Sequence, residues 1–350
     1  MKRILCIFMI LVMTLGLFSC AINDTEIDVI WSDLEDDYLA TIADAVDRGM
    51  YIKNIKYRHV DSEGDAAKQL SQVDAALEKN NIVVVSATDP VTAIAIVEKA
   101  RAKEATVIFL CCDVAKATVD SYEKCYYVDV DARSVFEVLG ERIAADLVAD
   151  YDKYDRNKDG KISYLAFGDA SLLALNVSKI NEKLKAAGKP ELVFYDDENP
   201  AKTVLTTDIG ATVSEIFAEY TDENKNTPEL ILSQDDAEIE PLLLALRSNE
   251  LDYNNTKLTT HFIPLYTVGI SANCGNLIPD KKEEERAAYS VMNAIDNGFV
   301  SAAALENDDE IAICLASLLE GWIKGEDAYA DIDADLIDGR CISVPYTIYG

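Results

Sequence analysis

The feature that most constrains the fold of this chain is an almost unbroken alternation of short apolar runs with longer amphipathic runs. Short runs rich in β-branched residues are typical of strands, and the longer runs have the apolar spacing of helices. The alternation indicates parallel sheets that are covered by helices on both faces. The strands are expected at 27–31, 52–57, 82–86, 106–111, 162–167, 192–195, 230–233, 263–268, 300–304 and 342–346. The helices are expected at 38–47, 65–79, 91–103, 134–151, 172–187, 213–220, 237–247, 281–297 and 310–324.

This number of strands is too large for one sheet of ordinary size, and a chain of 350 residues is long enough for two domains. We therefore expect an α/β protein with two doubly wound, parallel-sheet lobes. Ligands of such folds bind outside the carboxyl ends of the strands. The segments in which we expect ligand contacts therefore follow strands: 32–38, 87–90, 111–116, 168–176 and 233–238.

The amino terminus, MKRILCIFMILVMTLGLFSC, is typical of an export signal. Lys2 and Arg3 precede an apolar run that is too short for an ordinary membrane span. The run ends at Cys20, and LFSC resembles a bacterial lipobox, which implies cleavage before Cys20 and a lipid on its sulfur. We expect residues 1–19 to be a lipoprotein signal peptide and 20–24 a lipidated tether, so that the lipid alone holds the chain to a membrane. A plain secretory signal is the alternative.

The charge and the motif content of the chain exclude several classes of protein. The formal net charge of -31 predicts repulsion of nucleic acid and of anionic lipid. A hydrophobic fraction of 49% indicates a large core and not a disordered acidic chain. His59 and His261 are the only histidines, and the sequence contains no metalloprotease helix motif, nucleophile elbow, phosphate loop or dinucleotide fingerprint. Nothing in it argues for an enzyme.

Six cysteines remain in the exported chain once Cys6 and the lipidated Cys20 are set aside. No two of them form a C-x-x-C pair, and several lie in apolar segments, so buried free thiols are the expectation for most. A disulfide among them stays open, because spacing alone cannot assign one. The six are Cys111, Cys112, Cys125, Cys274, Cys314 and Cys341.

The run DRNKDGKIS has oxygen-bearing groups at the alternate positions of a calcium loop. Gly160 lies at the sixth position, where such a loop turns sharply. The twelfth position, which would carry a bidentate glutamate, is Ala166, and ISYLAF predicts a strand instead of the second helix of an EF-hand. Two interpretations follow: a turn that binds nothing, or a nine-residue loop completed by a distant carboxylate. The oxygen donors of the run are Asp155, Asn157, Asp159, the carbonyl of Lys161 and Ser163.

Five segments, in this order, resemble the galactose/glucose-binding proteins of bacterial ABC sugar transporters, which are type I periplasmic binding proteins. The resemblance implies two discontinuous lobes joined by a multi-strand hinge, with a ligand held in the cleft between them. The first lobe would comprise 25–129 with 307–339, and the second 130–306 with 340–350. The segments are 87–101, 120–133, the loop at 155–163, 228–237 and the terminal VPY at 344–346.

The resemblance also implies how the loop binds a Ca²⁺ ion. In this family a glutamate at the start of a strand closes the coordination shell, and the matching residue is Glu229. Ser163 departs from the usual glutamine and reaches less far. The implied role of the metal is structural. The implied ligands are Asp155, Asn157, Asp159, Lys161, Ser163 and Glu229.

This sequence matches only some of the sugar-binding positions that the resemblance implies. Asp36 matches the family's aspartate after the first strand, and Tyr38 matches its stacking aromatic residue. Asp36 has an alternative role at a helix start and Tyr38 in core packing. Each lost hydrogen-bond partner costs about 1–3 kcal/mol, so several changes would erase micromolar affinity. Other family positions carry or lie near Ser86, Asn176, Asp235 and Glu306, and apolar or small residues stand at Leu172 and Gly269.

These observations predict an exported, lipid-anchored solute-binding protein of an ABC transporter, located in the periplasm or on the outer face of the cytoplasmic membrane. By resemblance, its ligand would be a monosaccharide such as galactose or glucose, or a related compound. Its partners would be a membrane permease and, as a further candidate, a chemoreceptor. The alternative is a binding-protein fold with a degenerate sugar site that acts as a sensor or an envelope interaction protein.

Overall fold

The computed structural model describes residues 26–131, 134–196, 198, 202–204, 206, 208–217, 228–234, 238–248, 263–269, 291–325, 329, 332, 335–337 and 339–350. These residues form two compact units. Unit 1 comprises the chain up to Val130 together with Asp308–Val344, and unit 2 comprises Asp131–Asn307 with Pro345–Gly350. The chain therefore passes from one unit to the other three times. The expected signal peptide, tether and Cys20 lie outside the described residues.

The sheet of unit 1 is parallel except for one edge strand, in the order β11-β12-β5-β4-β3-β1-β2. Because β1 lies between β2 and β3, the direction of winding reverses beside β1, and this is the switch point of a doubly wound sheet. The strands are β1 (Ile27–Trp31), β2 (Tyr57–Asp61), β3 (Ile82–Val85), β4 (Thr106–Leu110), β5 (Cys125–Val130), β11 (Asp335–Ile337) and β12 (Cys341–Val344).

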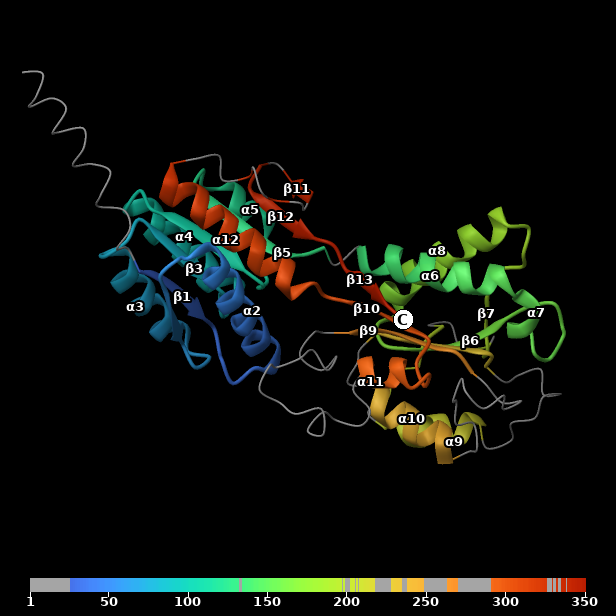
Figure 1. Ribbon diagram of the computed structural model, residues 1–350. Coiled ribbons are helices and arrows are strands. Elements are labelled where there is room, and N and C mark those ends of the chain that lie inside the picture. The colour runs from blue at the N-terminus through green and yellow to red at the C-terminus, as the bar shows by residue number, and fades with distance from the viewer. Residues whose placement is uncertain are drawn as a thin grey trace, which may run out of the picture. The chain divides into compact units, whose positions relative to one another are not determined.

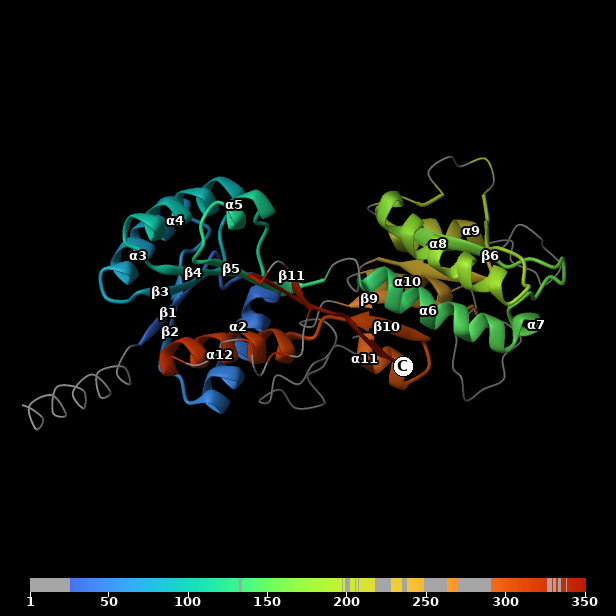
Figure 2. The same ribbon diagram turned by 90° about the horizontal axis from the view of Figure 1, so that it is seen from above.

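Helices cover both faces of this sheet (Figures 1 and 2). On one face, α2 (Asp37–Lys53) and α12 (Asp308–Lys324) pack on the strands around the fully buried Trp31. On the other lie α3 (Ala66–Leu77), α4 (Pro90–Ala102) and α5 (Lys116–Asp120). An aspartate caps each of the three long helices that follow β1, β2 and β3, because its side chain accepts hydrogen bonds from the first-turn N–H groups. The capping residues are Asp36, Asp65 and Asp89.

Unit 2 also has a mostly parallel sheet. Its strand order is β13-β10-β9-β8-β6-β7, and β13 is antiparallel to β10. Two helical layers enclose its sheet, one with α6 and α8 and one with α9, α10 and α11 (Figure 1). The strands are β6 (Ser163–Phe167), β7 (Val193–Phe194), β8 (Leu230–Ser233), β9 (Leu265–Gly269), β10 (Ala302–Leu305) and β13 (Thr347–Tyr349). The helices are α6 (Ser134–Ala149), α7 (Tyr151–Tyr154), α8 (Ala170–Ala186), α9 (Ile209–Phe217), α10 (Ile239–Ser248) and α11 (Val291–Asp296).

The expected fold class, two doubly wound α/β units, is confirmed. The strand expected at 52–57 is wrong, because α2 continues to Lys53 and is closed by Asn54 in the left-handed conformation (φ 54°). The sequence pattern also missed α5 and β5. The tail from Arg340 was expected in the second lobe, but β12 pairs in parallel with β5 and belongs to unit 1 as far as Val344.

Within the described residues, no disulfide joins the cysteines, which are Cys111, Cys112, Cys125, Cys314 and Cys341. Burial is the main reason that the pKa of Cys125 is raised to about 12, so this thiol stays protonated at neutral pH. Among the helices in the described ranges, none has the length and the apolar character that a bilayer span requires.

Candidate functional site

A cavity of about 400 Å³ opens at the carboxyl edge of the unit 1 sheet. Its walls come from the segments that follow β1, β3 and β4, and β1 and β3 are the neighbours at the switch point. This is the place where doubly wound folds bind ligands. The lining residues are Ser32, Asp36, Tyr38, Leu39, Ser86, Ala87, Thr88, Asp89, Pro90, Cys111, Cys112 and Asp113.

Asp36 and Tyr38 each have the structural role that the sequence offered as the alternative, and each also lines the cavity. Asp36 caps α2, because its carboxylate accepts a hydrogen bond of 3.0 Å from the N–H of Leu39. The same exposed side chain lines the cavity. Tyr38 is half-buried against the core between α2 and the sheet, and it also lines the cavity. Ligand contact is therefore compatible with a structural role for each residue.

The end of β3 is held by Gln69 of α3. The Gln69 side chain donates to the carbonyl of Ser86 at 2.9 Å and accepts from the N–H of Thr88 at 3.0 Å. Asp89 then caps α4 and also accepts from the hydroxyl of Thr92 at 2.6 Å. These bonds, first that from the Thr92 side chain, lower the pKa of Asp89, so this cavity residue is ionised at neutral pH.

The end of β4 supplies a strained residue and an inert thiol. Cys111, at the cavity wall, has a φ of 46°, a left-handed conformation that is uncommon for a residue with a side chain. Burial raises the pKa of the Cys112 thiol to about 12. The single hydroxyl proton of Tyr127 on β5 is shared between the carbonyl of Cys112, at 2.9 Å, and the carboxylate of Asp129, and this contact holds the turn. Cys112 therefore contributes shape and not reactivity.

The lining chemistry of the cavity suits a neutral ligand with several hydroxyl groups. Carboxylates of Asp36, Asp89 and Asp113 accept hydrogen bonds, and hydroxyls of Ser32, Ser86 and Thr88 can donate or accept. No lining residue in the described part of the chain is basic, so nothing there would neutralise an anionic ligand. Tyr38 adds a flat apolar surface for a ring.

The other expected ligand residues, Asn176, Asp235 and Glu306, are not among the residues that line this cavity in the described part of the chain. Asn176 is 3% exposed, lies next to α6 and lines neither cavity described here. Glu306 is buried, and its carboxylate accepts a hydrogen bond of 2.8 Å from the hydroxyl of Tyr346 in the terminal VPY. Asp235 lies outside the described residues. The structure thus brings Asp36, Tyr38 and Ser86 to one cavity of unit 1, and Asn176 and Glu306 of unit 2 are not among the residues that line it.

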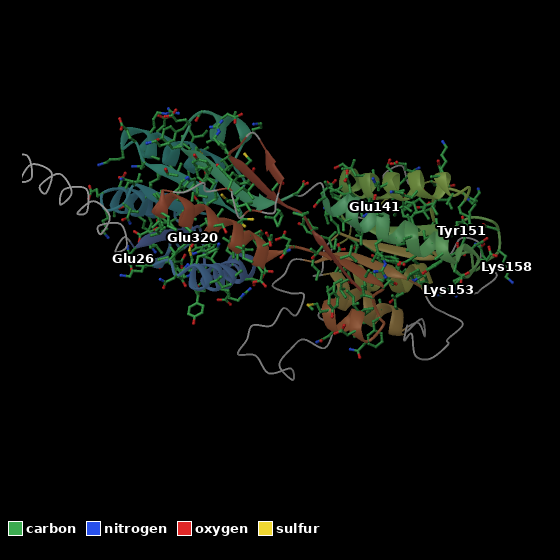
Figure 3. The ribbon with its side chains drawn as sticks, turned by 45° about the horizontal axis from the view of Figure 1, so that its top comes forward. Glu26, Glu141, Tyr151, Lys153, Lys158 and Glu320 are labelled. Atoms are coloured by element: carbon green, nitrogen blue, oxygen red, sulfur yellow. The ribbon has the colours of Figure 1, made fainter. Side chains whose placement is uncertain are left out.

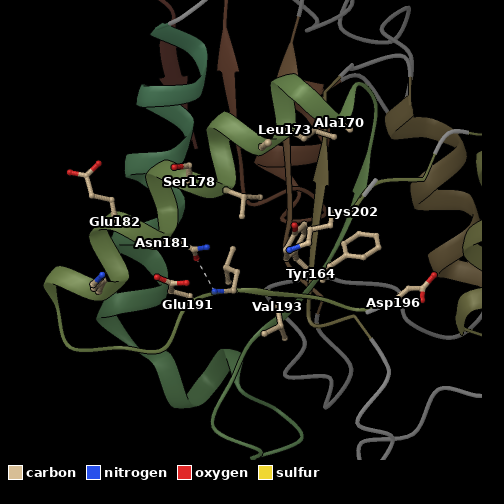
Figure 4. Close-up of a pocket in the computed structure, with 15 residues that line it drawn as sticks. Tyr164, Ala170, Leu173, Ser178, Asn181, Glu182, Glu191, Val193, Asp196 and Lys202 are labelled. Atoms are coloured by element: carbon tan, nitrogen blue, oxygen red, sulfur yellow. Dashed lines mark hydrogen bonds between the residues drawn. The ribbon is translucent and has the colours of Figure 1, made fainter. Parts of the chain in front are cut away.

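A larger cavity, about 850 Å³, lies in unit 2 between α8 and the edge strand β7 (Figure 4). Tyr164 and Phe194 contribute aromatic surface, while Glu182, Lys185 and Lys202 bring charges of both signs. It contains none of the expected ligand residues and follows the outer edge of the sheet. The smaller cavity is the better candidate, because it lies at a switch point and holds three expected residues.

The loop at 155–163 is closed by Glu229, the residue that the resemblance assigned to it. One oxygen of Glu229 accepts hydrogen bonds from the N–H groups of Arg156 (2.7 Å) and Asn157 (3.0 Å). The other accepts from the N–H (3.0 Å) and the hydroxyl (3.3 Å) of Ser163. The strand predicted after the loop is β6, so the loop is not an EF-hand.

A hydrogen bond inside the loop fixes the turn at Gly160, the sixth position. The N–H of Gly160, which has a φ of 87°, donates to Asp155 Oδ2 at 2.9 Å. The other oxygen of Asp155 is buried and accepts no hydrogen bond from the described residues. In the described ranges, however, no three His, Cys, Asp or Glu side chains are arranged to hold a metal ion. Besides Asp155 and Glu229, the loop offers the amide of Asn157, the carboxylate of Asp159, the carbonyl of Lys161 and the hydroxyl of Ser163 as oxygen donors.

The electrostatics of the loop favour a cation. Burial, opposed by three backbone hydrogen bonds and reinforced by the charge of Asp155, raises the pKa of Glu229. Burial first, and then the charges of Asp155, Glu229 and Asp159, raise the pKa of Tyr151 to about 12. Figure 3 labels Lys158 within the loop and Tyr151 in α7, which precedes it. A buried carboxylate oxygen with no partner, next to a second buried carboxylate, is an environment that a divalent ion would neutralise.

Comparison with known proteins gives the same fold and shows sequence similarity to a curated protein over part of the chain. Residues 27–308 match the family described as "Periplasmic binding protein domain". The D-galactose/methyl-galactoside binding periplasmic protein MglB of Haemophilus influenzae is 29% identical over 144 residues. That stretch is 41% of this chain and spans only 43% of the relative.

Solved structures agree over nearly the whole chain, at identities that establish the fold alone. A periplasmic ribose ABC transporter structure from Conexibacter woesei aligns with a TM-score of 0.59 and 14% identity, covering 93% of this chain and 91% of that one. A chain of the TorS sensor domain–TorT complex aligns with a TM-score of 0.56 and 12% identity, covering 93% and 92%.

Proposed function

This chain belongs to the family of periplasmic binding protein domains, and from this premise we propose that it binds a small neutral sugar or cyclic polyol for an ABC transporter. The family consists of binding proteins and not of enzymes, in agreement with the lack of a catalytic motif in the sequence. The observation that carries the proposal is the cavity at the switch point of unit 1, lined by Asp36, Tyr38 and Ser86.

The choice of ligand class rests on chemistry and on relatives. Carboxylates and hydroxyls without a basic partner suit neutral hydroxyl groups, as described above. The partial relative carries a name that states galactoside binding, and a solved structure with the same fold is titled as a ribose transporter. Contributions from Asn176, Asp235 and Glu306 stay predictions. A panel of sugars and polyols in a thermal unfolding assay tests the proposal.

We further propose that the loop at 155–163 binds Ca²⁺. Asp155, Asn157, Asp159, Lys161 through its carbonyl, Ser163 and Glu229 would hold the ion. The buried, unpartnered oxygen of Asp155 and the placement of Glu229 in the loop support this. The ion would neutralise these carboxylates and stabilise unit 2 by mass action. Its role would be structural, because the loop follows α7 and does not line the candidate ligand cavity.

We also propose export and lipidation. The family supports an exported chain, and the LFSC sequence supports a lipid on Cys20. The expected partners are a membrane permease and, as a further candidate, a chemoreceptor.

The second candidate function is sensing or envelope interaction through a binding-protein fold. Asn176 is buried and is not among the residues that line the candidate cavity, and a chain of a solved sensor complex has the same fold. A chain of this type would respond to no sugar in the panel and would still be recovered with an envelope partner.

A further inference from the structure

One wall of the candidate cavity is the turn at 111–113, which follows β4 and has two contacts with β5. The N–H of Cys111 donates to the carbonyl of Val128 at 3.1 Å. The carbonyl of Cys112 lies 2.9 Å from the hydroxyl of Tyr127. The left-handed φ of Cys111 makes the turn unfavourable by itself, so its position depends on such contacts.

Tyr127 has one hydroxyl proton and two neighbouring acceptors. Its oxygen is within hydrogen-bond distance of the carbonyl of Cys112 and of the carboxylate of Asp129, which lies two positions further along the same face of β5. A carbonyl and an ionised carboxylate can only accept, so while Asp129 is ionised the two compete for one proton, and the charged acceptor binds it more strongly. When Asp129 is protonated, it donates to the oxygen of Tyr127, and the hydroxyl proton is left for the carbonyl of Cys112.

The surroundings of Asp129 favour its protonated form. Burial raises the pKa of this carboxyl, and the hydrogen bonds from Tyr127 and Val130 only partly oppose the effect. Among the residues that the structure describes, no cation is paired with Asp129. On the neighbouring strand β12, the residue opposite is the uncharged Ser343.

The other titratable groups around this contact do not supply the second proton. Burial is the main cause that raises the pKa of the Cys112 thiol to about 12, so this thiol stays neutral, and Asp113 adds a negative charge beside it. On α5, which packs on the same face of the sheet, Lys116 is paired with Asp120 at 3.1 Å. The charge of Asp129 therefore decides which acceptor binds the hydroxyl proton.

We propose that Tyr127 and Asp129 are positioning residues of the candidate cavity, and that a proton bound by Asp129 fixes the turn at 111–113 against β5. The inference rests on the proposed function and adds how one wall of its cavity is regulated. With the proton bound, Tyr127 holds the carbonyl of Cys112 and thereby the carboxylate of Asp113 at the cavity. When the proton leaves, Asp129 takes the hydroxyl proton and the turn is released. Ligand affinity is therefore expected to fall as the pH rises.

The test first follows amide hydrogen exchange of the segment 111–115 in the ligand-free mature chain by mass spectrometry. The pH series runs from about 4 to about 9, the range in which a buried carboxyl titrates, and rates are corrected for the intrinsic pH dependence of exchange. Tyr127→Phe removes the hydroxyl, and Asp129→Asn offers an N–H donor at every pH. Tyr122→Phe is the matched control, because the hydroxyl of Tyr122 is also buried and donates to a carbonyl, that of Ala105 at 2.8 Å, but lines no part of the cavity.

In the unmodified chain we expect the protection of this segment to fall severalfold as the pH rises. Asp129→Asn should keep the protection at every pH, Tyr127→Phe should lack it at every pH, and Tyr122→Phe should behave as the unmodified chain. Protection that is independent of pH in the unmodified chain, or that falls equally in Asp129→Asn, would overturn the proposal. This comparison decides the proposal even if Tyr127→Phe does not fold, which circular dichroism checks.

Calorimetric titration with the sugar or polyol that most raises the unfolding midpoint measures the consequence for binding. We expect the affinity of the unmodified chain to fall severalfold over the same pH range and that of Asp129→Asn to stay constant. If exchange depends on pH while affinity does not, the turn moves without affecting the site, and the positioning role is overturned. If no compound binds, the proposed function fails, while hydrogen exchange still decides whether the proton fixes the turn.

Discussion

Glu229 closes the loop at 155–163 by accepting hydrogen bonds from the N–H and the hydroxyl of Ser163, at 3.0 and 3.3 Å, although 66 positions separate the two residues. The contact ties the start of β8 to the start of β6, neighbouring strands in the core of unit 2. Its carboxylate takes part in four hydrogen bonds, so much of the order of the loop depends on one side chain.

Replacing Glu229 by glutamine is therefore expected to destabilise the protein by about 2–4 kcal/mol, because an amide offers one acceptor oxygen and places its N–H₂ group against N–H donors. Urea unfolding measures the loss. Glu215→Gln is the matched control, since Glu215 is an exposed residue of α9. A loss no greater than that of the control would show that the loop does not depend on this carboxylate.

Calcium at about a hundred times its dissociation constant is expected to stabilise the unmodified chain by about 2.7 kcal/mol. The gain should vanish with chelator and in Glu229→Gln and Asp155→Asn. Asp152→Asn, one turn earlier, is the control and should keep the gain. If calcium does not change the free energy of unfolding of the unmodified chain, while Glu229→Gln still lowers it, the carboxylate closes the loop without a metal.

Asp36→Asn is expected to weaken ligand binding by about tenfold or more, because a ligand hydroxyl would lose a charged acceptor. Asparagine is as good a helix cap as aspartate, so the unfolding midpoint should stay nearly unchanged. The neighbouring Glu35→Gln, which lines no part of the cavity, should bind normally. Calorimetric titration distinguishes these outcomes, and equal affinity in both variants would exclude Asp36 from the site.

Asp129 is expected to make the free energy of unfolding depend on pH, because its pKa is raised in the folded protein. Burial raises its pKa in the folded protein, and the hydrogen bonds from Tyr127 and Val130 only partly oppose this. The folded state thus binds the proton more tightly than the unfolded state. The contribution of Asp129 to stability is greatest below the unfolded pKa of about 3.9 and falls as the pH rises through the raised folded value.

Asp129→Asn is therefore expected to gain stability relative to the unmodified chain as the pH rises above about 4. Its amide oxygen can still accept from Tyr127. Urea unfolding at a series of pH values gives the difference curve, and Asp113→Asn, at an exposed position, is the control. A flat difference curve would contradict the raised pKa.

Cys20→Ser is expected to move the protein from the membrane fraction to the soluble fraction, because the serine hydroxyl cannot replace the lipidated sulfur. Cys6→Ser lies within the same apolar run and should leave the protein in the membrane fraction. Immunoblots measure the amount of each variant in the membrane and soluble fractions. Retention of Cys20→Ser at the membrane would indicate an uncleaved signal or another anchor.

The sequence predicted what depends on local pattern. Strands such as β1 and β8 were placed correctly because apolar runs bounded by polar residues have few alternative structures. The rule that ligands bind at the carboxyl ends of strands predicted the segments 32–38 and 87–90, and residues of both line one cavity. The choice of Asp36, Tyr38 and Ser86 came from family resemblance. The pairing of Glu229 with its loop came from family resemblance, since the chain offers many other carboxylates.

The features that the sequence did not predict depend on contacts between segments that are distant along the chain. The run around Tyr51 and Ile52 resembles a strand, but the packing of α2 against α12 and the left-handed Asn54 keep it helical. The pairing of β12 with β5 moved the tail as far as Val344 into unit 1. Nothing in the local pattern showed that Asn176 would turn into the interior beside α6.

Thermal unfolding of the mature chain against a panel of neutral monosaccharides, disaccharides and cyclic polyols tests the central claim most directly. The account predicts that at least one compound raises the unfolding midpoint of the unmodified chain and fails to do so at the same concentration in Asp36→Asn. If no compound raises the midpoint of a chain that is folded, or if Asp36→Asn responds as strongly as the unmodified chain, sugar binding at this cavity is contradicted.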